Sequence, residues 1–319
     1  VGYLNVASVG NGNNRVFTVG SANIVMAGNG NDELQSIGSA NVFFANAGNN
    51  RMTAIGNGNL FVAADGNDDA LLVGNANLAV LGGGNNNALL AGGTGNLVQA
   101  GAGNDKVVAL GGANVLVLGD GNNTVDAGDG NDTLVAGSGN DKLLGGTGND
   151  SISAGDGNDA VLMDADYDSV AGTGNDTVLG GTGNDVIYGG TLASPDAQGS
   201  GNDVIDSGEG NDVVYAGDGA DSVTAGTGAD TVYAGAGDDT VESGDGNDSV
   251  LAGDGNDSVL GGSGDDTVSS GAGNDSVDAG IGNDVILADA GNDTLDGGNG
   301  IDLLDFSAIT SGLTLDLAA

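Results

Sequence analysis

A nine-residue repeat fills the second half of this 319-residue chain and limits its possible folds more than any other feature. Each copy has a glycine-rich turn, an aspartate in the sixth place and an apolar residue two places later, as in residues 145–153, GGTGNDSIS. Self-similarity at a short fixed period indicates a chain that coils and stacks each turn on the last. We therefore predict an all-β parallel solenoid, with the apolar column filling a narrow interior.

The first 118 residues keep this period in altered form, with a unit of eighteen residues. One series of turns ends alternately in asparagine and aspartate: Asn14, Asp32, Asn50, Asp68, Asn86, Asp105, Asn123 and Asp141. The other series ends in asparagine: Asn23, Asn41, Asn59, Asn77, Asn96 and Asn114. Because two nonamers make eighteen residues, we predict two short strands and two turns in each rung.

The charge of the chain is strongly one-sided. It has 45 acidic and four basic residues, a formal net charge of −41, and it contains neither histidine nor cysteine. Such a chain repels itself unless cations neutralise it. The charge argues against nucleic acid as a partner, no apolar run approaches the ~20 residues of a transmembrane segment, and zinc sites built from cysteine and histidine are excluded.

The aspartate turns indicate a metal site. Glycines in the second and fourth places free the backbone to expose carbonyl oxygens, and the aspartate adds an anionic oxygen. Stacking brings aspartates eighteen residues apart, such as Asp132 and Asp150, to one edge of successive rungs, and a flexible all-oxygen site favours Ca²⁺ over Mg²⁺. The predicted ligands are Asp132, Asp141, Asp150, Asp159, Asp176, Asp185, Asp203, Asp212, Asp221, Asp230, Asp239, Asp248, Asp257, Asp266, Asp275, Asp284 and Asp293, with Gly128, Gly130, Gly146, Gly148, Gly181, Gly183, Gly262 and Gly264.

These nonamers closely resemble the RTX (repeats-in-toxin) calcium-binding β-roll family, over residues 119–305. The resemblance implies a right-handed parallel β-roll, type I secretion, and folding on meeting external calcium. Two places depart from the pattern. Residues 164–167 replace the glycine turn before Asp168, which puts calcium there in doubt, and residues 191–198, with the only proline, Pro195, predict a protruding loop.

Three parts follow from this pattern. We expect residues 1–118 to form an asparagine-ladder solenoid with little or no calcium, because each gap between rungs there has at most one carboxylate. Residues 119–305 form the calcium β-roll, interrupted by the loop 191–198. Residues 306–319 begin a C-terminal cap or a further domain.

All four basic residues directly follow the mixed Asn/Asp series: Arg15, Arg51, Lys106 and Lys142. Glu33 and Asp69 stand at the same place in the intervening rungs, so the signs alternate at one-rung spacing. We expect ion pairs along this column that set the register, each worth about 0–1 kcal/mol. The alternative is an ordinary solvated face.

Apolar triplets follow the asparagine turns: residues 24–26, 42–44, 60–62, 78–80 and 115–117. Strand alternation cannot bury all three residues, so either the central residue or the flanking pair faces outward. We expect an apolar stripe near Val25, Phe43 and Phe61 that supports end-to-end or lateral self-association. The alternative is that a wider core or a missing flank of the chain covers it.

Catalysis has little support in this sequence. Without histidine or cysteine there is no Ser-His or Cys-His relay, no Gly-x-Ser-x-Gly motif occurs, and identical repetition of the carboxylates favours a ladder over a unique site. The sequence therefore predicts a non-enzymatic, calcium-stabilised structural protein outside the cell or attached to its surface, forming a fibre, surface layer or adhesin stalk. The alternative is the C-terminal folding and secretion module of a type I secreted toxin, protease or lipase. Ice or mineral binding is disfavoured, because the third place of the nonamer varies.

Overall fold

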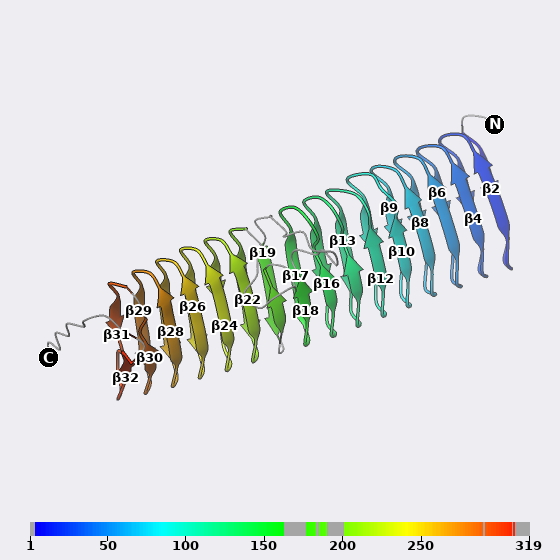
Figure 1. Ribbon diagram of the computed structural model, residues 1–319. Coiled ribbons are helices and arrows are strands. Elements are labelled where there is room, and N and C mark those ends of the chain that lie inside the picture. The colour runs from blue at the N-terminus through cyan, green and yellow to red at the C-terminus, as the bar shows by residue number, and fades with distance from the viewer. Residues whose placement is uncertain are drawn as a thin grey trace. The chain divides into compact units, whose positions relative to one another are not determined.

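The structure is a computed structural model that describes residues 4–162, 177–182, 185–189, 201–289, 291–307 and 309. The chain divides into two compact units, Val1–Tyr167 (unit 1) and Asp168–Ala319 (unit 2). In each unit short parallel strands alternate between two sheets, and the described residues contain no helix (Figure 1). This confirms the predicted parallel β-solenoid with two strands in each rung.

Unit 1 has two parallel sheets, which we call sheet A and sheet B. Sheet A contains β1 (Val6–Ser8), β3 (Ile24–Met26), β5 (Val42–Phe44), β7 (Leu60–Val62), β9 (Leu78–Val80), β11 (Leu97–Gln99), β13 (Val115–Gly119), β15 (Thr133–Ala136) and β17 (Ser151–Asp156). Sheet B contains β2 (Arg15–Val19), β4 (Glu33–Ile37), β6 (Arg51–Ile55), β8 (Asp69–Val73), β10 (Asn87–Leu90), β12 (Lys106–Ala109), β14 (Thr124–Asp126), β16 (Lys142–Leu144) and β18 (Ala160–Leu162).

Unit 2 repeats this arrangement. Its sheet A contains β19 (Thr177–Thr182), β21 (Val204–Glu209), β23 (Ser222–Thr224), β25 (Thr240–Asp245), β27 (Ser258–Ser263), β29 (Ser276–Ile281) and β31 (Thr294–Asp296). Its sheet B contains β20 (Val186–Tyr188), β22 (Val213–Asp218), β24 (Thr231–Ala236), β26 (Ser249–Asp254), β28 (Thr267–Ala272), β30 (Val285–Leu287) and β32 (Leu303–Asp305).

Strand pairing follows the eighteen-residue rung. Leu134 pairs with Ile152, and in unit 2 Val232 pairs with Val250. The interval is longer between β19 and β21, where Thr177 pairs with Val204, 204 − 177 = 27 residues on. That interval holds one additional nonamer and includes the predicted loop 191–198, which itself lies outside the described residues, as does most of the predicted cap 306–319.

The core of each unit is a thin stack of inward-facing side chains. The apolar residue two places after a turn aspartate is buried in most described rungs, as at Leu134, Ile152 and Val232. Alanine usually occupies the next inward place, as at Ala154 and Ala234. Small and branched side chains therefore alternate along the strand, which suits an interior only two sheets thick.

The apolar triplets of unit 1 bury their central residue. Val25, Phe43 and Phe61 are fully buried, and the rings of Phe43 and Phe61 stack with centroids 5.3 Å apart. Their neighbours Met26 and Phe44 are each 40% exposed. Of the two alternatives, the flanking pair is thus the one that faces outward, and Val25, Phe43 and Phe61 are core residues rather than members of the exposed stripe.

Candidate metal centre

The turns stack so closely that glycine is required at two places. Gly146 and Gly148 have φ of 103° and 124°, in the left-handed region, and a Cβ on either would collide with the carbonyl group of Gly128 or Gly130 in the preceding rung. A glycine-rich turn therefore aligns main-chain carbonyl oxygens along the edge of the solenoid.

An asparagine turn satisfies both ends of its side chain. The Oδ1 atom of Asn50 accepts the backbone N–H of Asp32 at 3.1 Å. Its Nδ2 group donates to the carbonyl oxygens of Asn46 at 3.0 Å and Gly48 at 2.8 Å, four and two residues earlier. The same pair of carbonyl contacts recurs at Asn14, Asn86 and Asn123. The amide thus supplies protons to two main-chain oxygens.

An aspartate turn keeps the first of these contacts and loses the second. Asp68 is in the next rung of the same ladder, and its Oδ1 atom accepts the backbone N–H of Asn50 at 2.7 Å. Its Oδ2 atom is buried and has no hydrogen-bond partner. Since the ladder contact is the same, we infer that Oδ2 takes the place of the amide nitrogen and faces carbonyl oxygens. Three oxygens that meet without a proton call for a cation.

The same pattern runs through the aspartate ladders of both units. In unit 2 the backbone N–H of Asp230 donates to Oδ1 of Asp248, and that of Asp248 donates to Asp266, each at 2.9 Å. Buried Oδ2 atoms without a hydrogen-bond partner occur at Asp32, Asp68, Asp105, Asp132, Asp141, Asp212, Asp221, Asp230, Asp239, Asp248, Asp257, Asp266, Asp275 and Asp284.

Burial disfavours the ionised form of these carboxyl groups when no cation is bound. It raises the pKa of Asp239 to about 7, although the hydrogen bond from the Asp221 amide lowers it, and the carboxylates of Asp221 and Asp257 raise it further. Burial likewise raises the pKa of Asp230 to about 7. A neighbouring opposite charge is what restores the ionised form of such a group.

The donor set fits calcium. Within the described residues, no three acidic side chains are grouped so that they could hold a metal ion by themselves, so an ion at a turn would need main-chain carbonyl oxygens as well as carboxylate oxygens. Calcium takes six to eight oxygen ligands of this mixed kind in flexible geometry. The glycine carbonyls and buried Oδ2 atoms supply those two types.

The structure places most predicted ligands in turn positions of this kind. Asp150, Asp159, Asp185 and Asp203 are buried members of the ladders, and Asp293 is half-buried and accepts the N–H of Asp275 at 3.1 Å. Among the predicted glycines, those with φ in the left-handed region are Gly128, Gly130, Gly146, Gly148, Gly181, Gly262 and Gly264. Asp176 and Gly183 lie outside the described residues.

Three further aspartates of unit 1 share this chemistry: Asp32, Asp68 and Asp105. Little or no calcium was expected in residues 1–118, because asparagine turns flank each of these aspartates. Gly-x-Gly-x-Asp, the form of the turn at residues 28–32 and 101–105, is the sequence signal that identifies two of them.

The opposite edge of unit 1 forms the expected asparagine ladder. Asn23 donates from Nδ2 to Oδ1 of Asn41 at 2.8 Å, and Asn41 donates in the same way to Asn59 at 3.1 Å. These side chains are fully buried. Each amide thereby satisfies hydrogen-bonding groups of its turn without a metal.

Comparison with known proteins supports the metal chemistry. A family model described as the RTX calcium-binding nonapeptide repeat matches the chain in overlapping copies that together span residues 5–34, 81–191 and 199–304, which is more than half of its length. No curated protein matches the chain. In the described part of the structure, no helix is long and apolar enough to span a membrane.

Proposed function

The chain belongs to the RTX calcium-binding nonapeptide repeat family, and on this premise we propose that it is an extracellular structural module whose aspartate turns fold around calcium. The observation that carries the proposal is the series of buried Oδ2 atoms without hydrogen-bond partners. Burying a charge without compensation is costly, and bound calcium would remove that cost at each aspartate turn.

Calcium binding would couple folding to the environment. A chain of net charge −41 gains little from compaction while its carboxylates are free. In a compartment with little calcium it would stay extended and suit export by type I secretion. Outside the cell, calcium binding to the folded state alone would stabilise each rung that contains an aspartate turn.

A mechanical or adhesive role suits this architecture. Each repeated rung adds one strand to each of the two sheets, so the length of a unit depends on its number of repeats. Unit 1 also exposes apolar side chains such as Met26 and Phe44 on sheet A. Exposed apolar rows of this kind support lateral self-association or attachment to a cell surface. The product would be a fibre, a surface layer or an adhesin stalk.

The second candidate is a folding and secretion module of a type I secreted toxin, protease or lipase. Family membership itself favours it, because blocks of RTX repeats accompany many activities. A catalytic or pore-forming domain in the same gene product would decide for this function. Further repeats or a surface anchor would decide for the structural one.

Calcium titration of the whole chain tests the proposal. We expect far-UV circular dichroism to show much less β-structure in chelator than in excess Ca²⁺, with the asparagine-ladder part of unit 1 supplying what remains. In isothermal titration calorimetry, Asp239→Asn should lower the number of bound ions, since Asp239 is buried with a free Oδ2. Asp238→Asn is the matched control, because the neighbouring Asp238 is exposed and its Oδ1 atom accepts a hydrogen bond from the backbone N–H of Asn256. An unchanged spectrum in chelator, together with equal stoichiometry for both variants, would refute the proposal.

A further inference from the structure

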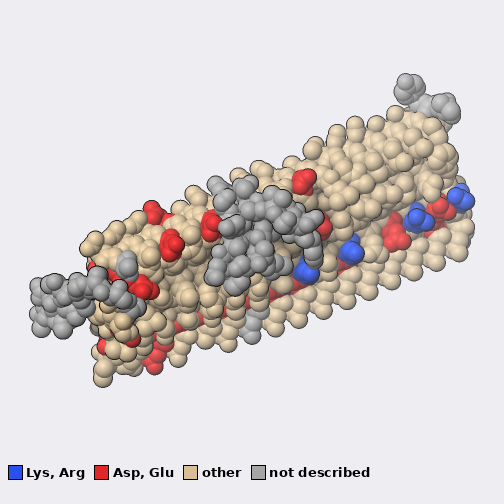
Figure 2. All heavy atoms as spheres, in the orientation of Figure 1, with Lys and Arg blue, Asp and Glu red and all other residues tan. Residues whose placement is uncertain are grey.

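The outward side of sheet B in unit 1 carries an ordered row of charges. The pairing register aligns Glu33, Arg51, Asp69, Asn87, Lys106, Thr124 and Lys142 across β4 to β16, and we call this row the charged column. Every lysine and arginine of the chain lies in this column or, for Arg15, in the preceding strand. Figure 2 shows these basic side chains in one line with acidic side chains between them.

Most of these cations have no ion-pair partner among the residues that the structure describes. Arg15 pairs with Glu33 at 3.1 Å, whereas Arg51, Lys106 and Lys142 form no ion pair with any described residue. Asp69, which was expected to pair with Arg51, instead accepts a hydrogen bond from Asn87 at 3.1 Å. In a molecule of net charge −41, three unpaired cations on one face are available to an outside partner.

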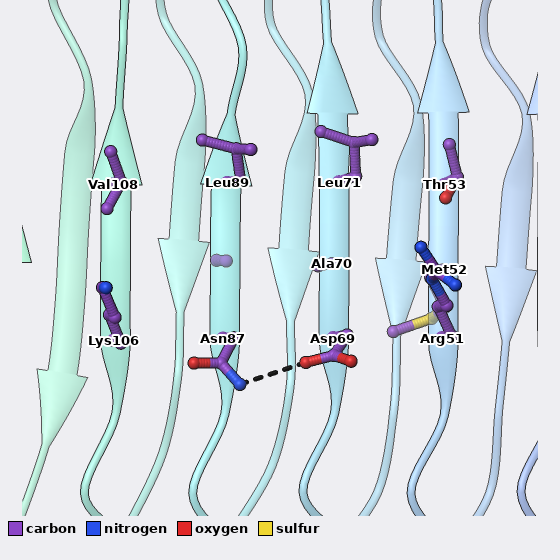
Figure 3. A pocket seen from close by; sticks show the side chains of 11 residues that line it. Arg51, Met52, Thr53, Asp69, Ala70, Leu71, Asn87, Leu89, Lys106 and Val108 are labelled. Carbon is purple, nitrogen blue, oxygen red and sulfur yellow. Dashed lines mark hydrogen bonds between the residues drawn. The ribbon is translucent and has the colours of Figure 1, made fainter.

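A groove runs beside the charged column. It has a volume of about 420 Å³ and separates Arg51, Asp69, Asn87 and Lys106 from a second row of Thr53, Leu71, Leu89 and Val108. Figure 3 shows the two rows standing on successive strands, with the small Ala70 between them. Leu89 is 40% exposed beside this groove. The face therefore combines ordered charges with uncovered apolar surface.

We propose that this face binds the same face of a second copy in an antiparallel, two-fold dimer whose axis follows the strand direction and passes by Leu89. A second copy can place the same face against this one in two orientations that keep the strands of the two copies aligned. Rotation about the stacking direction sets the charged column against the Val and Ile side chains at the far ends of the strands, such as Ile37 and Ile55. Rotation about the strand direction sets the charged column on itself in reverse order.

In the reversed order the charges match. With Asn87 of one copy opposite Asn87 of the other, Asp69 faces Lys106 and Arg51 faces Thr124. One strand further out, Glu33 faces Lys142. Since a two-fold interface contains each contact twice, four opposite-charge pairs form and no like charges meet.

The second row matches in the same register. Leu89 faces its own copy at the axis, Leu71 faces Val108, and Thr53 faces the carboxylate of Asp126, which continues this row on β14. A shift of one strand in either direction would place Arg51 against Lys106 or against Lys142. Like charges directly opposite one another disfavour those registers.

The contact is large enough for a specific but modest interface. Seven strands at ~4.8 Å spacing and a width of five residues give roughly 1,100 Å² buried in total. That area lies at the lower limit for stable protein complexes. We therefore expect a dimer whose population rises with protein concentration. The dimer needs a folded unit 1, which on the proposed function requires calcium at its aspartate turns. It is therefore tested in excess calcium, with circular dichroism as a separate readout of folding.

Sedimentation velocity on the whole chain in calcium, over a range of concentrations, tests the dimer. Lys106→Glu and Asp69→Lys each set like charges against each other twice, so each should weaken dimerisation by about tenfold or more. The double variant D69K/K106E exchanges the two charges and should return the affinity to near that of the native chain. Asp65→Lys, on an exposed turn, changes the net charge as much as Asp69→Lys and should leave the dimer intact.

Circular dichroism of each variant separates loss of the dimer from loss of the fold. A native chain that stays monomeric at every concentration would overturn the proposal. So would a folded double variant that dimerises no better than its parents, or a single variant that dimerises as the native chain does.

Discussion

The side chains of Asn50 and Asp68 hold equivalent places in successive rungs of one ladder, yet only Asn50 finds partners for both of its ends. Asn50 gives its amide protons to two carbonyl oxygens, at 3.0 and 2.8 Å. Asp68 accepts one backbone N–H at 2.7 Å, and its other oxygen is buried with no hydrogen bond. The ladder therefore alternates a turn that is complete by itself with a turn that needs a cation.

Exchanging these two residue types should shift the stability of the metal-free protein in opposite directions. In metal-free buffer, Asp68→Asn should stabilise unit 1 by about 1–3 kcal/mol, because the amide would replace the buried, unpartnered Oδ2 atom with a donor to the carbonyl oxygens it faces. Asn50→Asp should destabilise it by a similar amount. Urea denaturation followed by circular dichroism measures both shifts. A lower midpoint for Asp68→Asn without metal would contradict our account of the turn.

The pH dependence of the metal-free protein has an uncommon sign. Burial raises the pKa of Asp230 and of Asp239 from 3.8 to about 7 in the folded state. A carboxyl group whose pKa is raised by folding contributes its stability below the unfolded pKa, and loses it as the pH rises through the folded pKa. Metal-free protein should therefore gain β-structure as the pH falls from about 8 to 5.

Far-UV circular dichroism across this range, after removal of metal, checks the pH effect. Excess Ca²⁺ at pH 8 is the control, since calcium replaces the proton and should give the full β signal there. A metal-free protein that loses β-structure on acidification between pH 8 and 5 would show that these carboxylates are not buried as charged groups.

The sequence contains enough to predict the rung and the phase of the apolar triplets, but not the partners of the charged side chains. The nine-residue period is enough to place the aspartate and asparagine ladders, because side chains eighteen residues apart must stack. The phase was derivable too: Val25 follows Asn23 by two residues, as the buried Leu134 follows Asp132. Ion pairing was not derivable, because Asn87 competes with Arg51 for Asp69 through a hydrogen bond that alternating signs do not reveal.

Alanines in the asparagine turns have an unfavourable backbone conformation. Ala40 has φ of 57° in the left-handed region, where the equivalent Gly58 has φ of 65°. Ala40→Gly should therefore stabilise unit 1 by about 1 kcal/mol, since the left-handed conformation costs an L-residue about that much. Gly58→Ala is the converse test, because a Cβ there would meet nothing within 4 Å and only the backbone cost remains. Equal denaturation midpoints for all three proteins would refute this explanation.

The burial of Phe43 next to the exposed Phe44 predicts unequal costs for two adjacent substitutions. Phe43 is fully buried and stacks on Phe61, whereas Phe44 is 40% exposed. Backbone hydrogen bonds fix the spacing of the rungs above and below, so the walls of a cavity at Phe43 cannot close. Phe43→Ala should cost about 3–5 kcal/mol of unfolding free energy, and Phe44→Ala, an exposed position, less than about 1 kcal/mol. Denaturant midpoints in calcium measure both, and a larger loss for Phe44→Ala would mean that the triplets bury the opposite face.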